Sequence, residues 1–182
     1  MLTGAIKLFA TNYNLLVLLI SIVISLIALY TDLKEHKIYN QLTFSAMILG
    51  VLCNLAIDYR LWYLPLFGIL LGFVILFIPF SLGGIGAGDV KLLMALGAFL
   101  GAKAIIWITL FAAIAGGIIS AGAIIKRHGL NSGLYRIYLI FTSIWNQANR
   151  QQVKNLETTE KIYIPYGLAI FIGLIIVVLW RP

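Results

Sequence analysis

Two aspartates are the residues most able to do chemistry, because each adjoins a long apolar stretch of the chain. Asp32 directly follows the apolar run at about 15–31, and Asp89 ends a glycine-rich run that begins at Gly83. An ionisable side chain at membrane depth is costly, so such a residue is a functional candidate by default. The sequence predicts that these two carboxylic acids come together in one site.

Two carboxyl groups held close together cannot both ionise easily, so the pair shares one proton. One carboxylate can then activate a water molecule while the other protonates a departing group, which is the chemistry of an aspartyl protease. The proton belongs to the pair, so the assignment of acid and base stays open. The structural alternatives are a boundary charge for Asp32 and a helix cap for Asp89. The remaining acids lie in polar loops: Glu35, Asp58, Glu157 and Glu160.

The composition describes the surroundings of this pair. Of the 182 residues, 62% are hydrophobic and 10% are charged, whereas a soluble domain carries about 25% charged residues. We therefore expect a polytopic protein embedded in the lipid bilayer. The net charge of +7 comes from scattered basic residues, so no nucleic-acid partner is expected. One cysteine, Cys53, and two distant histidines, His36 and His128, predict neither a metal site nor a cofactor.

Hydropathy predicts an all-α fold, in one membrane-embedded domain over residues 1–182, with about six transmembrane helices. A helix needs roughly 20 apolar residues to cross about 30 Å of hydrocarbon. The predicted spans lie near 14–31, 41–57, 63–80, 89–101, 104–125 and 162–180. The fourth is short, since 13 residues rise only about 20 Å. The apolar and basic segment near 134–141 predicts an amphipathic helix lying in the interface.

The basic residues predict the orientation of these spans, because cytoplasmic loops carry an excess of Lys and Arg. The loops at 32–40 and 126–161 are assigned to the cytoplasm. They hold Lys34, Lys37, Lys126, Arg127, Arg136, Arg150, Lys154 and Lys161. The other side holds Lys7, Arg60, Lys103 and Arg181. Two crossings separate Asp32 from Asp89, so both carboxyl groups are expected at the cytoplasmic face.

The glycines between 83 and 88 have two interpretations. They could form a tight re-entrant turn, or they could let a substrate backbone approach the catalytic residue closely. A dinucleotide-binding loop is a poor interpretation, because the run follows an apolar helix and not a strand. The small-xxx-small patterns that begin at Gly68 and at Gly97 are typical of helix packing.

Three segments resemble the type IV prepilin peptidases, membrane aspartyl proteases of the GxGD class. Residues 32–40 read DLKEHKIYN, with Tyr39 where the family usually has proline. Residues 86–93 read GAGDVKLL and match the family's signature closely, and residues 164–169 read IPYGLA. The resemblance covers essentially the whole chain in order. It implies that Asp32 and Asp89 are the catalytic pair. It also implies substrate-binding or site-shaping roles for Gly86, Gly88, Lys91, Asn40, Pro165, Tyr166 and Gly167.

The resemblance further implies that the chain cleaves short, basic leader peptides from pilin-like precursors at the cytoplasmic face of the cell membrane, in a type IV pilus or protein secretion system. Larger members also methylate the new N-terminus through a segment with two CxxC pairs. With one cysteine, this chain is expected to lack N-methyltransferase activity. Its short length looks most like the compact enzymes of Tad/Flp-type systems. Neither the particular pilin nor the oligomeric state follows from the sequence.

Three alternatives stay open at this point. A small ion- or proton-coupled transporter could use Asp32 and Asp89, although a transport site would sit nearer the middle of the bilayer with paired broken helices. A related intramembrane protease could act on other substrates by the same chemistry. A non-catalytic assembly subunit is disfavoured by the intact pair of acids.

Overall fold

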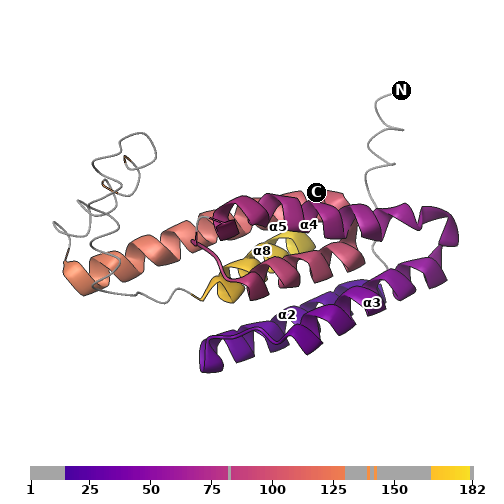
Figure 1. Ribbon diagram of the computed structural model, residues 1–182, viewed down its shortest axis with the longest axis horizontal. Coiled ribbons are helices and arrows are strands. Elements are labelled where there is room, and N and C mark those ends of the chain that lie inside the picture. The colour runs from indigo at the N-terminus through magenta and orange to yellow at the C-terminus, as the bar shows by residue number, and fades with distance from the viewer. Residues whose placement is uncertain (1–14, 82, 130–138, 140–141, 143–164, 181–182) are drawn as a thin grey trace. The chain divides into compact units, whose positions relative to one another are not determined.

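The fold is helical throughout the part of the chain that the structure describes. The computed structural model describes residues 15–81, 83–129, 139, 142 and 165–180. In chain order its elements are α2 (Leu15–Glu35), α3 (Asn40–Ile57), the 3₁₀ turn η1 (Tyr59–Leu61), α4 (Tyr63–Ser81), α5 (Ala87–His128) and α8 (Tyr166–Trp180) (Figure 1). These helices confirm the all-α prediction for the described residues.

Packing divides the chain into two units. One combines Met1–Ala113 with Pro165–Pro182, and the other is Ile114–Ile164. Every described residue of the predicted site lies in the first unit, which is the helix bundle considered below. The prediction of a single domain over the whole chain stays a prediction.

Four helical stretches are long and apolar enough to cross a membrane. They are Leu15–Glu35, Asn40–Ile57, Tyr59–Ser81 and Ala87–Ala123, while Tyr166–Trp180 is a shorter apolar helix. These stretches support a membrane protein, but they do not establish the predicted six crossings. The predicted interfacial helix near 134–141 lies, apart from Leu139, outside the described residues.

A break at Gly101 divides α5 into two helical parts. Gly101 has φ 74° and ψ 175°, which is not helical and is a conformation that side chains rarely allow. The predicted fourth and fifth spans, 89–101 and 104–125, correspond to the two parts. The sequence therefore located the boundary, although the first part begins at Ala87, two residues earlier than predicted.

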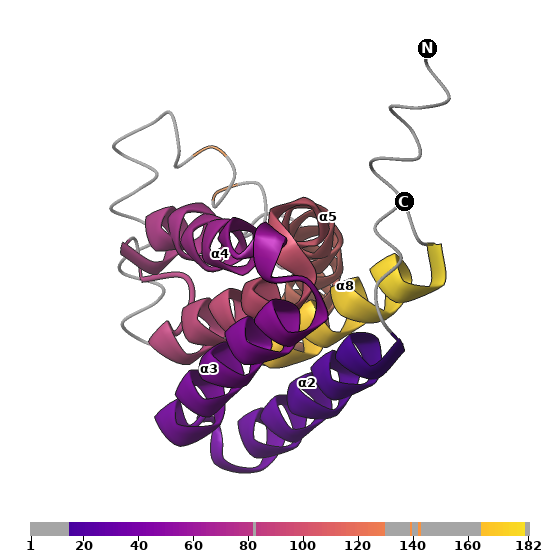
Figure 2. The same ribbon diagram turned by 90° about the vertical axis from the view of Figure 1, so that its right-hand side faces the viewer.

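Contacts with α3 and α8 show that the chain reverses at this break. Near its start α3 bonds to residue 91, and near its end it bonds to residues 98 and 99, so α3 runs parallel to the first part of α5. In α8, Gly173 faces Ala112 and Trp180 packs edge-on against Trp107, so α8 runs antiparallel to the second part. Because Tyr166 at the start of α8 lies near Asp89 at the start of α5, residues 102–113 run in the opposite direction to residues 87–100 (Figure 2).

The first part of α5 is the centre of the bundle. Its inward side chains are fully buried: Leu92, Leu93, Ala95, Leu96 and Ala98 are 0% exposed. Gly68 of α4 and Gly97 of α5 meet backbone to backbone, because a Cβ on Gly68 would lie 2.0 Å from the carbonyl oxygen of Gly97. This close contact agrees with the helix-packing interpretation of both small-xxx-small patterns.

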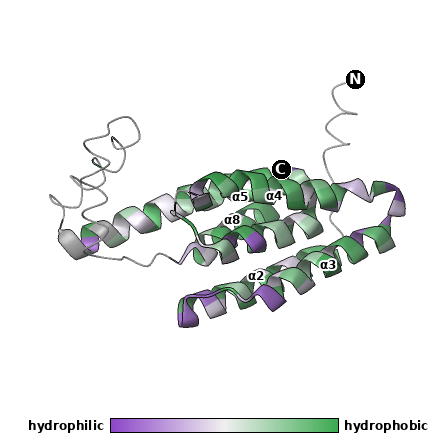
Figure 3. Cartoon of the chain, viewed as in Figure 1, coloured by the Kyte–Doolittle hydropathy of each residue, from purple (hydrophilic) through white to green (hydrophobic). Residues whose placement is uncertain are grey.

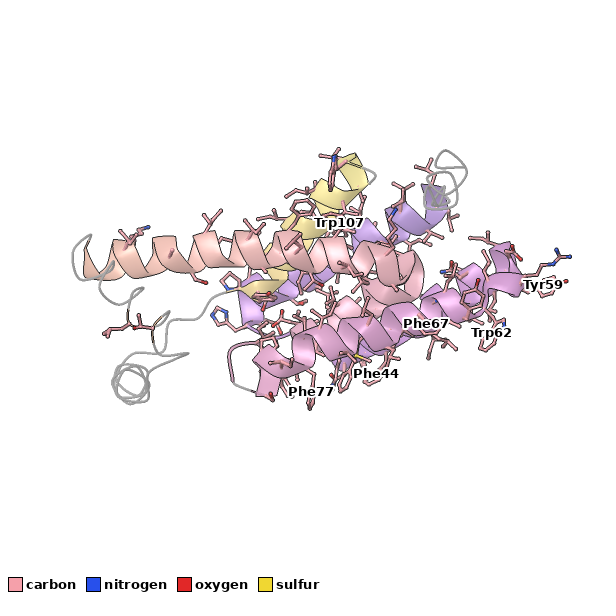
Figure 4. The ribbon with its side chains drawn as sticks, turned by 90° about the horizontal axis from the view of Figure 1, so that it is seen from above. Phe44, Tyr59, Trp62, Phe67, Phe77 and Trp107 are labelled. Atoms are coloured by element: carbon pink, nitrogen blue, oxygen red, sulfur yellow. The ribbon has the colours of Figure 1, made fainter. Side chains whose placement is uncertain are left out.

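Most residues of α2, α3 and α4 are hydrophobic, and the hydrophilic residues of these helices lie towards the turns (Figure 3). Large exposed side chains include Leu19, Ile48, Phe67 and Phe77. Figure 4 shows Phe67 and Phe77 pointing away from the neighbouring helices, with Tyr59 and Trp62 at the turn before α4. Exposed apolar helix faces with aromatic residues near the turns are typical of helices surrounded by lipid.

Candidate active site

The last turns of α2 carry Asp32 into the interior of the bundle. Asp32 is 4% exposed and lies on the buried face of α2, in line with Ser21, Ser25 and Ala28. Hydropathy predicted the end of this span at residue 31, whereas the helix continues to Glu35. The extra turn keeps Asp32 in helical geometry, so its side chain faces the other helices and not the loop.

The glycine-rich run ends one helix and starts the next. The N–H of Gly83, which has φ 79°, donates to the carbonyl of Phe80, and the N–H of Gly84 donates to the carbonyl of Pro79. This pair of bonds is the Schellman motif, in which a left-handed glycine satisfies the last carbonyls of a helix. The tight turn, one of the two interpretations of the run, therefore has the form of a helix end at Gly83 and Gly84, here that of α4.

Asp89 is held by the start of its own helix. The N–H of Gly86 donates to Oδ2 of Asp89 at 3.2 Å, which is half of a capping box, with the acid at the third helical position. The capping role expected as the structural alternative is thus present, although from the third position. However, Asp89 is only 8% exposed, and its Oδ1 is buried without a hydrogen-bond partner among the described residues. An ordinary cap would leave that oxygen to water.

The first turn of α8 brings the two acids into one site. The buried N–H of Gly167 donates to Oδ2 of Asp32 at 3.0 Å. The neighbouring residue, Tyr166, lies close enough to Asp89 to interact with its charge, and the charges of Asp89 and Asp32 interact with each other. The structure therefore brings together both predicted carboxyl groups with two of the predicted site-shaping residues. Their roles in catalysis stay predictions.

The loop between α2 and α3 lies against the start of α5. A Cβ on Gly88 would come within 2.9 Å of the Cβ of Ile38, so the absence of a side chain at Gly88 gives this loop its place beside Asp89. Ile38 was not among the predicted site residues. Its position inside the segment 32–40 was the signal that could have identified it.

Tyr39 lies where the prepilin peptidases that this segment resembles usually have proline, and it joins the two ends of the same loop. Its hydroxyl donates a hydrogen bond to Oε2 of Glu35. This bond and the negative charge of Glu35 raise the pKa of Tyr39 above its ordinary value. The tyrosine therefore ties the loop by its side chain, where proline would stiffen the backbone.

Lys91 and Asn40 lie at the same end of the bundle and contact each other. Nζ of Lys91 donates to Oδ1 of Asn40 at 2.8 Å and lies 5.4 Å from the ring centroid of Phe44. This contact joins α3 to α5. Lys91 is also the charged member of the lining of an apolar cavity of about 260 Å³ between α3, α4 and α5.

Pro165 precedes α8, and its carbonyl accepts a hydrogen bond from the N–H of Leu168 at 3.2 Å. It thus forms the first turn that presents Gly167 to Asp32. Within the described part of the chain, no group of three or more His, Cys, Asp or Glu residues could hold a metal ion.

The comparison with known families identifies the chain. Residues 16–121 match the model of the type IV leader peptidase family, a region that includes Asp32 and Asp89 but not the start of α8. No curated protein and no solved structure matches the chain. The family match covers more than half of the sequence, contains two of the three segments that carry the resemblance (32–40 and 86–93), and fits a bundle of long apolar helices. The chain therefore belongs to the type IV leader peptidase family and is a membrane peptidase.

Proposed function

We propose that this protein is an aspartyl endopeptidase that removes the basic leader peptide from pilin-like precursors at the cytoplasmic face of the cell membrane. The observation that carries the proposal is the meeting of two buried carboxyl groups, Asp32 and Asp89, at one end of the bundle. In a chain with so few charges, burying two acids whose charges interact is costly, and hydrolysis is a use that requires both.

The proposed reaction follows from one proton shared by the pair. One carboxylate takes a proton from a water molecule, and the oxygen of that water attacks the carbonyl carbon of the scissile peptide bond. The other carboxylic acid gives its proton to the departing nitrogen as the C–N bond breaks. Oδ1 of Asp89, which has no partner among the described residues, is available to bind this water or to hold the shared proton.

The position of the pair suits a precursor with a charged leader followed by an apolar helix. Such a substrate keeps its leader in the cytoplasm and its helix in the bilayer, so the scissile bond lies at the interface. Asp32 lies in the last turns of α2 and Asp89 in the first turn of α5, so both are near helix ends rather than in the middle of a span. This position also favours a peptidase over a transporter, whose site would lie near the bilayer midplane.

The test uses the purified full chain in liposomes with a synthetic precursor, made of a short basic leader fused to an apolar helix. Asp32→Asn and Asp89→Asn change each acid with almost no change of shape. Each is expected to lower the rate of leader release, followed by mass spectrometry, by at least about 1,000-fold. Asp58→Asn is the matched control, because Asp58 is an exposed turn residue.

Wild-type protein that cleaves the precursor while both variants fail, and Asp58→Asn succeeds, supports the proposal. Cleavage at the wild-type rate by Asp32→Asn or Asp89→Asn would contradict the paired-acid mechanism. Thermal unfolding of each variant in detergent separates a loss of chemistry from a loss of fold.

A further inference from the structure

The first turn of α8 offers backbone donors that its own helix cannot use. The first N–H groups of any α-helix have no acceptor within the helix, and a polar side chain just before the helix usually satisfies one of them. Here residues 162–164, which precede α8, are outside the described residues, and Pro165 has no N–H. The N–H of Gly167 instead donates to Oδ2 of Asp32, a residue 135 positions earlier in the chain.

This bond also leaves no room for a side chain. A Cβ on residue 167 would lie 2.7 Å from Oδ2 of Asp32 and 3.3 Å from its Cβ and Cγ. Real Cβ atoms do not approach an oxygen so closely, so the carboxyl group of Asp32 would have to rotate away. The glycine therefore does two things at once, because it supplies the donor and lets the carboxyl group come near enough to use it.

The other aspartate has a similar arrangement from a different source. Oδ2 of Asp89 accepts from the N–H of Gly86, and a Cβ on Gly86 would lie 3.1 Å from that oxygen. Gly86 and Asp89 belong to the same turn, so this contact forms whenever α5 forms. The contact at Asp32 is different, because it requires α8 to pack against α2.

We infer that Gly167 is a positioning residue, whose backbone N–H fixes the direction of the Asp32 carboxyl group relative to Asp89. The inference rests on the proposed function and adds to it a dependence on the last helix. α8 is seated where Gly173 meets the backbone of Ile108 and Ala112. Packing at Gly173 therefore brings the N–H of residue 167 to Asp32, and the catalytic geometry is complete only when α8 is in place.

The sharpest test removes the donor without adding an atom. Replacing Gly167 by glycolic acid changes its backbone N–H to an ester oxygen, which cannot donate. In the liposome assay with the synthetic precursor, this variant is expected to lower kcat by about 100-fold and to leave KM unchanged, since misplacing a catalytic group by about 1 Å has an effect of that size. Gly167→Ala is expected to lower kcat at least as far, through the contact with Oδ2.

Two glycine variants serve as controls. Gly84→Ala places its Cβ 3.4 Å from the carbonyl oxygen of Pro79, a distance that needs no movement of a catalytic group, and it is expected to keep the wild-type kcat. Gly173→Ala places its Cβ 2.5 Å from the carbonyl oxygen of Ile108, so it disturbs the seating of α8 without touching Asp32. It is expected to lower the melting temperature.

The outcomes separate this inference from the proposed function. An ester variant with the wild-type kcat, measured beside an inactive Asp32→Asn, overturns the role of Gly167 and leaves the peptidase intact. An active Asp32→Asn contradicts the proposed function itself. If Gly167→Ala fails to fold, the kcat of the ester variant still shows whether the N–H of Gly167 positions Asp32. An ester variant that melts like the wild type and loses kcat supports the positioning role.

Discussion

An aspartate at one end of the bundle has very different surroundings from an aspartate at the other end. Near the start of α4, Asp58 is exposed and its carboxylate accepts a bond from the N–H of Arg60, two residues away, at 3.0 Å. At the other end, Asp32 is buried and accepts a hydrogen bond from Gly167 of α8, a helix that is distant in sequence but adjacent in the fold. Asp58 shapes its own turn, and its sequence neighbours explain it fully. Asp32 makes sense only as part of a site assembled from several helices.

This difference teaches which changes should affect chemistry and which should affect folding. At the aspartate end, defined by Asp32, Asn40, Asp89 and Gly167, backbone groups are aimed at carboxyl oxygens. At the opposite end, defined by Asp58, Trp62 and Gly101, backbone groups close turns and end helices. Changes at the opposite end should therefore alter stability while leaving the catalytic step of the folded protein unchanged.

The largest expected effect concerns the sidedness of the two ends. In a Cys53→Ala background, Lys37→Cys should react with a membrane-impermeant maleimide only from the cytoplasmic side, and Arg60→Cys only from the other. Both side chains are exposed, and they lie in loops at the two ends of α3. The measurement is labelling of intact cells against inside-out vesicles. Labelling of both cysteines from one side would contradict the proposed orientation.

A smaller effect is expected from the chain reversal. Gly101→Ala should lower the free energy of unfolding by about 1–3 kcal/mol, because φ 74° with ψ 175° is strained for any side chain. Since the nearest neighbour of the new Cβ is 3.9 Å away, the cost is one of backbone strain and not of crowding. Unfolding in detergent with increasing denaturant measures it.

Gly117→Ala is the matched control for Gly101→Ala. Its new Cβ also meets open space, but Gly117 lies within a helix and has no positive φ. Alanine there should be neutral or should stabilise the helix by up to about 1 kcal/mol. Equal destabilisation by the two variants would show that backbone conformation at residue 101 is not the cause.

The smallest effect is expected at Asn54, whose side-chain amide bonds to carbonyl groups at the end of the first part of α5. Its Nδ2 donates to the carbonyls of Ala98 and Phe99 at 2.9 and 3.1 Å, which lie in the last turn before the break. Asn54→Ala should cost about 1 kcal/mol of stability, typical of a lost hydrogen bond, with kcat of the folded protein unchanged. Gln41→Ala, at an exposed position of the same helix, is the control. A large fall in the kcat of Asn54→Ala without a loss of stability would contradict the expectation that changes at this end affect stability and not catalysis.

Much of the site could be predicted because charges are conspicuous in an apolar sequence. Asp32 and Asp89 were predicted from the cost of burying charge, the glycine-rich run, the count of spans and the resemblance, and both lie in the interior. Their catalytic role stays a prediction. The bond between Gly167 and Asp32 could not be found in this way, because it joins a backbone N–H to a side chain 135 residues away. The spacing of residues along the sequence indicates which residues are neighbours on one helix. It does not indicate which backbone group of another helix will form a hydrogen bond with them.

Helix boundaries were predicted less well, for a physical reason. Hydropathy reports which residues prefer lipid, whereas a helix continues for as long as its backbone hydrogen bonds do. α2 therefore continues through polar residues to Glu35, four residues beyond the predicted span. The glycine-rich run was ambiguous because glycine suits a re-entrant turn, a helix end and a close contact equally. Only the hydrogen bonds of Gly83 and Gly84 distinguish these.

The break at Gly101 has a consequence for the depth of the helix that carries Asp89. Between residues 87 and 100 this helix rises only about 20 Å, at 1.5 Å per residue, whereas a hydrocarbon layer is about 30 Å thick. In such a layer at least one end of the helix would lie below the surface, where polar backbone must be satisfied by protein or by water. The neighbouring helices that bury this segment would then also have to admit the water that hydrolysis consumes.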